Sequence, residues 1–191
     1  MTQAAFPETQ PRLKRTVVLV GMMGSGKTAI GKTLASQLGV AFRDSDEALV
    51  EAANMSIPEI FERDGEAFFR EKEAQIIARL MDLAPGVLST GGGAFLNPAT
   101  RDVIAARGIS VWLKADIELL WERVRHKDTR PLLRTPDPRA TLEALLRDRT
   151  PHYAQATLAV EAQAAYSIHE MTLAVIDALA TRPDVLDLPD A

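Results

Sequence analysis

Cysteine is absent from this chain of 191 residues, so the chain can form neither a disulfide nor a thiolate metal site. No apolar run approaches about 18 residues, and we expect no segment that crosses a membrane. The three histidines, His126, His152 and His169, are scattered without a second ligand at metal-binding spacing, so we assign none to a metal. The net charge of −4 gives no general attraction to nucleic acid or anionic membranes. These absences favour a cytoplasmic protein that binds neither nucleic acid nor membranes.

With 47% hydrophobic and 25% charged residues, the chain can bury the core of one globular domain. Residues 1–14 contain Pro7 and Pro11 but no apolar core of signal-peptide length, and we expect them to form a loose arm. The tail, residues 181–191, contains Pro183, Pro189 and several aspartates, and we expect it to be frayed. The folded core is therefore predicted over about residues 16–180.

Between these ends, short apolar runs alternate with longer helical stretches, as in βαβ units. The expected strands are Thr16–Val20, Val40–Arg43, Val87–Thr90, Ile109–Leu113 and Leu158–Val160. The expected helices are Lys27–Leu38, Asp46–Ala53, Ile57–Arg63, Glu66–Asp82, Asn97 to about Gly108, Asp116–Arg125, Pro138–Arg149 and Ile168–Leu179. The pattern predicts an α/β three-layer sandwich with a five-stranded parallel sheet, which binds ligands at the carboxyl ends of its strands.

The first expected strand leads into the segment Gly21–Thr28, which reads GMMGSGKT. Its spacing Gly-x4-Gly-Lys-Thr is that of the phosphate-binding P-loop. The glycines let backbone N–H groups point at an anion, and the following helix directs its positive end there. Lys27 supplies a cation for the outer phosphates, and Thr28 supplies a hydroxyl for Mg²⁺. A chance glycine-rich turn is the alternative, but the strand before and the helix after favour nucleoside triphosphate binding.

Asp44 and Asp46 follow the second expected strand. One carboxylate could lie near a hydrated Mg²⁺ while the other faces a substrate hydroxyl. The alternative is a helix N-cap, which aspartate commonly provides. A neighbouring P-loop favours the first interpretation.

Arg70 has Glu66 four residues before it and Glu73 three after it, which suits an exposed ladder of ion pairs. Alternatively, Glu73 orients Arg70 toward an anionic ligand, because a guanidinium pairs with a carboxylate in a planar fork. Spacing alone favours the ladder. The run Gly91–Gly93 after the third strand exceeds what a turn needs, and it indicates a ligand lying against the backbone.

Arg125 and residues 126–133 form a charged, proline-limited segment between two helices, with the composition of either a lid or an exposed basic loop. A lid arginine that enters late would stabilise a transferring phosphoryl group. Arg149 lies where Pro151 interrupts a helical run, and a solvated arginine at a helix end is the simpler interpretation there.

In this order and spacing, the motifs resemble the shikimate kinase family over about Thr16 to Leu179. The residues that carry the resemblance are Gly21–Thr28, Asp44-Ser45-Asp46, Ser56–Phe61, Phe69–Glu73, Gly91–Gly93, Arg130–Leu133 and Arg149–Tyr153. The resemblance implies transfer of the γ-phosphoryl group of ATP to the 3-hydroxyl of shikimate, with Mg²⁺ as cofactor. It also implies a P-loop NTPase fold like that of nucleoside monophosphate kinases, with a mobile lid over about residues 125–137.

Carried over position by position, the family's ATP-binding residues are Gly24, Ser25, Gly26, Lys27, Thr28 and Ala29, with Arg125 against the adenine and Arg130 over the phosphates. Mg²⁺ would be held by Thr28 and, through water, by Asp44. Shikimate would be held by Asp46, Arg70, Arg149 and the backbone of Gly92 and Gly93, with Glu73 orienting the arginines. Lys27, Asp46 and Arg130 are expected to be catalytic. The chain departs from the family at Gln163–Tyr166, where relatives often have arginine and proline near the adenine.

Other functions remain as alternatives. A gluconate kinase or nucleoside monophosphate kinase would share the P-loop, but the glycine run and paired arginines favour a small polyol that carries a carboxylate. A GTPase switch needs Asn-Lys-x-Asp, which the sequence lacks. A remodelling ATPase needs an apolar strand ending in Asp-Glu, whereas the fourth expected strand ends Val111-Trp112-Leu113-Lys114. We expect a monomer that acts on shikimate and ATP.

Overall fold

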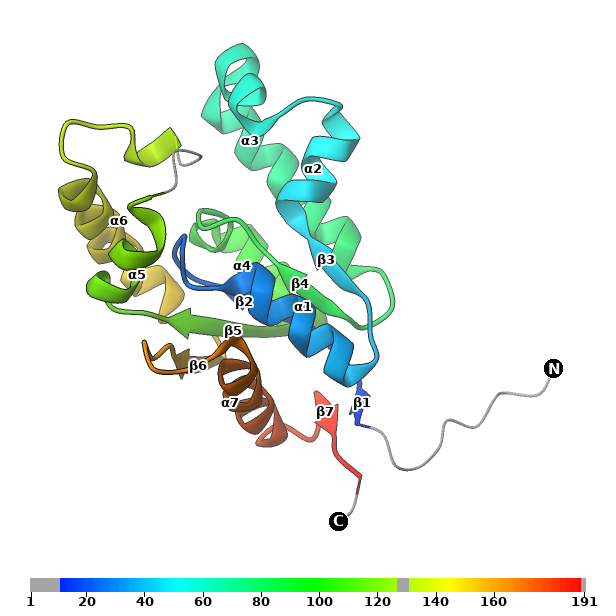
Figure 1. Ribbon diagram of the computed structural model, residues 1–191. Helices are drawn as coiled ribbons and strands as arrows, with labels where there is room; N and C mark the ends of the chain where they lie inside the picture. The colour runs from blue at the N-terminus through cyan, green and yellow to red at the C-terminus, as the bar shows by residue number, and fades with distance from the viewer. Residues whose placement is uncertain (1–10, 127–130, 190–191) are drawn as a thin grey trace.

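The computed structural model describes residues 11–126 and 131–189, and its centre is a parallel sheet of five strands. The strand order is β3-β4-β2-β5-β6, as Figure 1 shows. The strands are β2 (Thr16–Val20), β3 (Phe42–Asp44), β4 (Val87–Ser89), β5 (Gly108–Lys114) and β6 (Leu158–Glu161). In the register of the sheet, Val18 pairs with Leu88 on one side and with Ser110 on the other. The predicted α/β fold with five parallel strands is confirmed.

Seven α-helices and two short 3₁₀ helices connect the strands in the described residues. The α-helices are α1 (Lys27–Leu38), α2 (Ser45–Ala53), α3 (Ile57–Met81), α4 (Pro98–Arg107), α5 (Ile117–Val124), α6 (Pro138–Tyr153) and α7 (Ile168–Ala180). The 3₁₀ helices are η1 (Ala94–Leu96) and η2 (Pro131–Leu133). Ser56 and Glu59 form a capping box at the start of α3, and Asn97 caps α4, so side chains set both boundaries.

Three of the predicted helices differ from the observed ones. The segments expected as Ile57–Arg63 and Glu66–Asp82 form one helix, α3, with a break at Gly65, where φ is 83°. The helix expected to end at Arg149 continues through Pro151 to Tyr153. Proline removes a single hydrogen bond in the last turn, and the Thr150 hydroxyl donates to the Leu146 carbonyl there. The longer helix keeps Arg149 and Tyr153 on one rigid element.

Hydrophobic side chains fill both faces of the sheet because successive residues of a strand point to opposite sides. Val18 and Val20 of β2 pack into a cluster with residues of α3, α4, α5 and α6. Val17 and Leu19 pack on the other face with residues of α1 and α7. The sheet therefore lies between two helical layers, and α2 and α3 rise above it in Figure 1.

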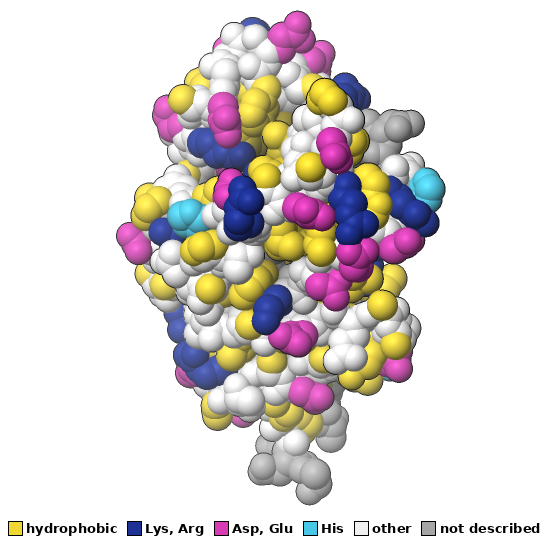
Figure 2. Space-filling model, turned by 90° about the vertical axis from the view of Figure 1, so that its left-hand side faces the viewer, with side chains coloured by type: hydrophobic (Ala, Val, Ile, Leu, Met, Phe, Trp, Pro, Cys, Tyr) yellow, Lys and Arg dark blue, Asp and Glu magenta, His cyan; other side chains and the backbone are white. Residues whose placement is uncertain are grey.

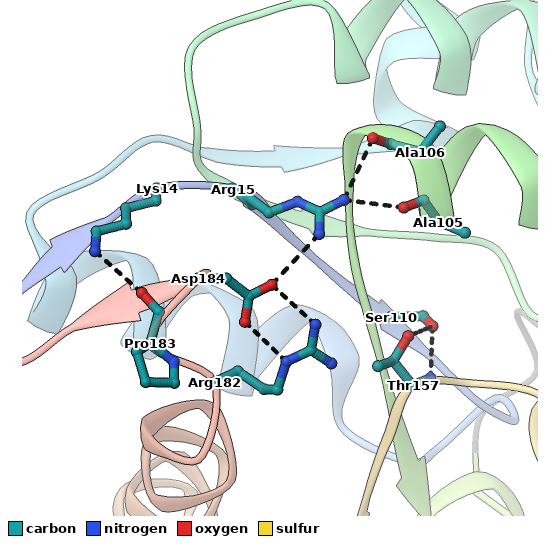
Figure 3. Close-up of polar contacts among 9 residues, drawn as sticks. All are labelled: Lys14, Arg15, Ala105, Ala106, Ser110, Thr157, Arg182, Pro183 and Asp184. Carbon is teal, nitrogen blue, oxygen red and sulfur yellow. Dashed lines mark hydrogen bonds and ion pairs between the residues drawn. The ribbon is translucent and has the colours of Figure 1, made fainter.

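A loose arm over residues 1–14 and a frayed tail over residues 181–191 were expected, but residues 11–14 and 181–189 take part in the fold; residues 1–10 and 190–191 lie outside the described residues. β1 (Arg12–Leu13) pairs antiparallel with β7 (Leu186–Asp187), and Leu13 and Leu186 are buried. Figure 3 shows the polar contacts beside this ribbon, including Arg15 with Asp184 and with the carbonyls of residues 105 and 106. Proline and aspartate had suggested disorder, but the apolar residues between them reach the core.

The surface carries both signs of charge. On the face drawn in Figure 2, Lys and Arg side chains are interspersed with Asp and Glu, and hydrophobic side chains lie between them. In residues 11–126 and 131–189, no helix is both long and apolar enough to span a bilayer.

Candidate active site

The loop between β2 and α1 has the backbone conformation that its glycines permit. Gly21, Gly24 and Gly26 have φ values of 142°, 82° and 95°, which side-chain-bearing residues rarely adopt. A Cβ at Gly21 would lie 2.9 Å from the Leu113 carbonyl oxygen of β5. Gly26 is the N-cap of α1 and makes no side-chain cap, so the first N–H groups of the helix remain available to an anion. The loop therefore has the backbone conformation that the predicted phosphate cradle requires.

Lys27 lies inside this cradle. Its Nζ donates to the carbonyl oxygens of Gly21 at 2.8 Å and Met22 at 2.9 Å, and the residue is only 9% exposed. Hydrogen bonds offset the cost of burying an ammonium group. The hydroxyl of Ser25 is also buried and has no hydrogen-bond partner among the described residues. A buried cation and an unsatisfied hydroxyl in one loop suit a polyanionic ligand.

Asp44 caps α2, as one of the two interpretations of the sequence expected, and it also contacts Thr28. Its Oδ1 accepts from the backbone N–H of Asp46 at 2.9 Å and Glu47 at 3.3 Å, which caps α2. Its Oδ2 accepts from the Thr28 hydroxyl at 3.4 Å. The cap therefore fixes the carboxylate beside the first turn of α1.

A hydroxyl and a carboxylate are oxygen ligands that suit Mg²⁺, which usually keeps several waters and adds phosphate oxygens. The described residues contain no group of three or more His, Cys, Asp or Glu that could hold a metal alone. Thr28 and Asp44 thus fit a Mg²⁺ ion that arrives with a nucleotide.

The glycine run after β4 is where the predicted acceptor residues meet. A Cβ at Gly91 would lie 2.9 Å from Asp46 Oδ1 and 3.0 Å from Glu73 Oε1. Side chains from α2 and α3 therefore reach the same point of the turn, and a methyl group would displace them.

The next two glycines contact the two arginines. A Cβ at Gly92 would lie 3.1 Å from an Nη of Arg149, and one at Gly93 would lie 2.6 Å from the guanidinium carbon of Arg70. The Tyr153 hydroxyl, one helical turn after Arg149, donates to the Gly92 carbonyl. Each glycine thus makes room for a different polar side chain, which explains why three are needed.

Buried charge distinguishes this cluster from a surface ion-pair ladder. Glu73 is 3% exposed and accepts from Arg70 Nη1 at 2.7 Å, whereas Glu66 is exposed and lies 3.6 Å from Arg70. The second carboxylate oxygen of Glu73 has no hydrogen-bond partner among the described residues. Burial raises the pKa of Glu73, and Arg70 and Arg149 oppose that rise while Asp46 adds to it. The geometry therefore favours the orienting role of Glu73 over the ladder.

Arg149 and Tyr153 are buried too. Arg149 is 7% exposed and Tyr153 is fully buried, although spacing alone had favoured a solvated Arg149. Burial raises the pKa of the Tyr153 hydroxyl above its ordinary value, and the neighbouring Arg149 offsets only part of that rise. A neutral tyrosine thus remains a hydrogen-bond donor to Gly92 at physiological pH.

A cleft of about 450 Å³ joins the phosphate cradle to the glycine turn. The predicted residues that line it are Gly24, Gly26, Lys27, Thr28, Ala29, Asp44, Asp46 and Gly92. Gly93, Arg70, Glu73 and Arg149 are not among its lining, but the three side chains contact the glycine turn that forms part of its wall. The structure therefore brings both sets of predicted residues to the carboxyl ends of the strands.

The arginine that contacts the predicted phosphate cradle is Arg123, two residues before the predicted Arg125. Arg123 lines the cleft and its Nη1 donates to the Gly24 carbonyl at 3.1 Å. Arg125 does not line the cleft, and its exposed side chain pairs with Glu122. The helical repeat could have distinguished the two arginines, because Arg123 lies three residues after the buried Leu120 and therefore on the same side of α5.

Arg130 and residues 127–129 lie outside the described residues. The sequence prediction assigned no site role to Tyr153, and none to the start of α7, where Tyr166, Ser167 and Ile168 line the cleft. Spacing alone does not show that these residues reach the site, because their positions depend on how α6 and α7 pack.

Comparison with known proteins agrees with this geometry. The family model described as shikimate kinase matches residues 23–180. A shikimate kinase from Ruegeria pomeroyi is 64% identical over 176 residues, which cover 92% of this chain and 90% of the relative. One from Cereibacter sphaeroides is 61% identical over 180 residues, with coverage of 94% and 90%.

Solved structures extend the likeness to the fold. A shikimate kinase from Acinetobacter baumannii in complex with shikimate has a TM-score of 0.83 and 34% identity, and the match covers 87% of this chain and 93% of that chain. A gluconokinase from Sinorhizobium meliloti, at 21% identity and a TM-score of 0.62, shares the fold alone. From its matching family model and its close relatives, the chain belongs to the shikimate kinase family.

Proposed function

We propose that the chain transfers the γ-phosphoryl group of ATP to the 3-hydroxyl of shikimate, giving shikimate 3-phosphate and ADP. The observation that carries the proposal is the glycine turn, which is contacted by Asp46, Arg70 and Arg149 and lies in the same cleft as Lys27. Membership of the family and the shikimate-bound relative support it.

The acceptor site matches shikimate group by group. Shikimate carries one carboxylate and three hydroxyls. Arg70 and Arg149 are proposed to clamp the carboxylate, because a guanidinium pairs with a carboxylate in a planar fork. Asp46 accepts from a ring hydroxyl, and the backbone of Gly92 and Gly93 lines the ring. Glu73 acts as a positioning residue, since its hydrogen bond fixes the direction of Arg70.

On the donor side, the backbone of residues 24–29 holds the phosphates of ATP and Arg123 contacts the nucleotide at the rim of the cradle. Thr28 and Asp44 would hold Mg²⁺, which when bound neutralises charge on the phosphates. Arg130 is proposed to enter over the phosphates from a lid over about residues 125–137. A monomer in the cytoplasm remains our prediction.

In the reaction, the 3-hydroxyl oxygen bonds to the γ-phosphorus while the bond from that phosphorus to the β,γ-bridging oxygen breaks. Lys27 moves from the carbonyls of Gly21 and Met22 to the phosphoryl oxygens and stabilises the charge there. Asp46, which lines the cleft, orients the attacking hydroxyl and accepts its proton. Positioning and charge neutralisation supply the catalysis, as is usual for phosphoryl transfer.

The direct test is ADP release in a coupled assay with and without Mg²⁺, using shikimate, gluconate and nucleoside monophosphates as acceptors. Shikimate must give the highest kcat/KM. A preference for gluconate or a nucleotide would reject the proposed acceptor.

The clamp is tested with Arg70→Ala and Arg149→Ala. Each should raise the KM for shikimate by about 30-fold or more, because unpairing a buried charge costs about 2–5 kcal/mol. The KM for ATP should change less than twofold. Arg107→Ala, an exposed arginine of α4, is the control. Unchanged shikimate KM in both clamp variants would refute the assignment.

A further inference from the structure

A second cavity, of about 420 Å³, lies between α2 and α3 and shares no lining residue with the ATP cleft. We call it the α2–α3 groove and define it by Leu49, Phe68, Lys72, Ile76 and Arg79. Its volume lies within the usual range for sites that bind small organic molecules.

The floor of the groove is apolar. One stripe along α3 lines the groove, because its residues follow one another at three- or four-residue spacing: Phe68, Lys72, Ile76 and Arg79. Leu49 and Ile76 are buried and form the apolar floor of the groove, whereas Phe68 is 37% exposed. The Lys72 Nζ lies 5.3 Å from the centre of the Phe68 ring. An aromatic surface is thus exposed beside a cation.

The rim of the groove is cationic. Arg63, Lys72 and Arg79 line it, and no aspartate or glutamate does. Asp64 pairs with Arg63 at 2.8 Å and so neutralises that part of the rim, while Gln75 accepts from Lys72 at 3.1 Å and donates to Glu71 at 3.0 Å. Lys72 and Arg79 therefore remain as two cationic groups beside the apolar floor.

We propose that the α2–α3 groove binds a small aromatic carboxylate, with the ring on Phe68 and Ile76 and the carboxylate between Lys72 and Arg79. A second copy of the chain is a poorer occupant, because a symmetric contact would bring two cationic rims together. The volume also suits a small molecule better than a folded partner.

Occupancy of the groove is expected to change the affinity for the acceptor. α2 begins beside Asp46, and α3 carries Arg70 and Glu73 on the face that meets the glycine turn. A ligand wedged between these helices therefore acts on the elements that position the acceptor residues, whereas the phosphate cradle lies on other elements. This second effect depends on the proposed function; binding in the groove does not.

Binding is tested by two-dimensional ¹H–¹⁵N NMR titration with 3-phenylpropanoate, and with 3-phenylpropanol as the neutral analogue. The carboxylate should shift the amide signals of Phe68 to Arg79 with a Kd on the order of 1 mM, as expected for so few atoms. The double variant Lys72→Gln/Arg79→Gln should weaken the carboxylate about fivefold and leave the alcohol unchanged. Lys32→Gln is the matched control, because it removes a lysine of α1 that lies over the ring of Phe42 in β3.

Equal binding of the acid and the alcohol, or shifts confined to the ATP cleft, would overturn the proposal. So would a concentration-dependent dimer that the double variant abolishes, which would assign the groove to a second copy. In the kinase assay, saturating 3-phenylpropanoate should change the KM for shikimate but not that for ATP. NMR binding without catalysis would reject the proposed function alone, and catalysis without binding would reject the groove site alone.

Discussion

The loop between β2 and α1 builds its binding surface from consecutive residues, whereas the turn after β4 gathers side chains from three helices. In the first region the backbone makes the site, and the Lys27 ammonium is held by backbone carbonyls. In the second, Asp46, Arg70 and Arg149 meet over glycines that leave them just enough room. ATP binding and catalysis should therefore be most sensitive to loss of the Lys27 side chain. Shikimate binding should be sensitive to small changes in side-chain size at the glycine turn.

The largest effect is expected when the cation is removed from the donor region. Lys27→Met should lower kcat/KM by about 10²–10³-fold, the cost typical of losing a group that stabilises transition-state charge. Steady-state ADP release measures it. Lys32→Met on the exposed face of α1 is the control, and comparable activity in the two variants would remove Lys27 from catalysis.

Adding one methyl group tests the acceptor region. Gly93→Ala should raise the KM for shikimate about 30-fold without changing that for ATP, because the new Cβ displaces the Arg70 guanidinium. Gly86→Ala is the packing control, since its Cβ would lie 2.7 Å both from the Ala41 carbonyl oxygen and from an Nη of Arg43, neither of which lines the cleft. If both variants lost stability alike and kept their KM values, the glycine would serve packing only.

Arg123 and Arg125, two residues apart, allow a test of which arginine contacts the nucleotide. Arg123→Ala should raise the KM for ATP about tenfold, because a charged hydrogen bond to the cradle contributes about 1.5 kcal/mol or more. Arg125→Ala should stay within about twofold, as an exposed ion pair contributes little. The opposite ranking in ATP titrations would restore Arg125 as the nucleotide contact.

A smaller effect is expected at the hydroxyl that supports the glycine turn. Tyr153→Phe removes the donor to the Gly92 carbonyl and should raise the KM for shikimate about fivefold, the equivalent of about 1 kcal/mol. Tyr166→Phe, at the donor end of the cleft, should leave that KM unchanged. Equal effects of the two variants would show that the acceptor region does not depend on this hydrogen bond.

The smallest effect concerns pH and stability. Because burial raises the folded-state pKa of Glu73 above its ordinary value of 4.5, the folded protein holds more protons than the unfolded chain just above pH 4.5. The free energy of unfolding therefore falls as pH rises through that window. Glu73→Gln removes this contribution, so the difference in Tm, wild type minus variant, should decline by a few degrees between pH 4.5 and 7. Glu66→Gln, an exposed partner of the same arginine, should show no such decline.

How far sequence predicts this molecule differs between the two regions as well. The P-loop was predictable because its function follows from local backbone conformation, which glycine spacing encodes. The fold was predictable because apolar runs alternate with helices. Spacing alone left Arg70 and Arg149 as surface residues, since the burial of Arg149 and the contact of Arg70 with the turn depend on how α3 and α6 pack. Arg123 and Tyr153 were missed for the same reason. The strands at the two ends, β1 and β7, were missed because a strand of two residues has too weak a pattern to recognise.

The pairing of β1 with β7 also matters for how the protein can be rebuilt. Arg12 and Asp187 are partners in that ribbon, so a short linker could join them without crossing the cleft. A circularly permuted chain opened at the exposed turn near Pro85 would keep the cradle, the glycine run and both arginines intact. Such a permutant would put the glycine run and Arg149 before the cradle along the chain and reveal whether folding depends on which of them is synthesised first.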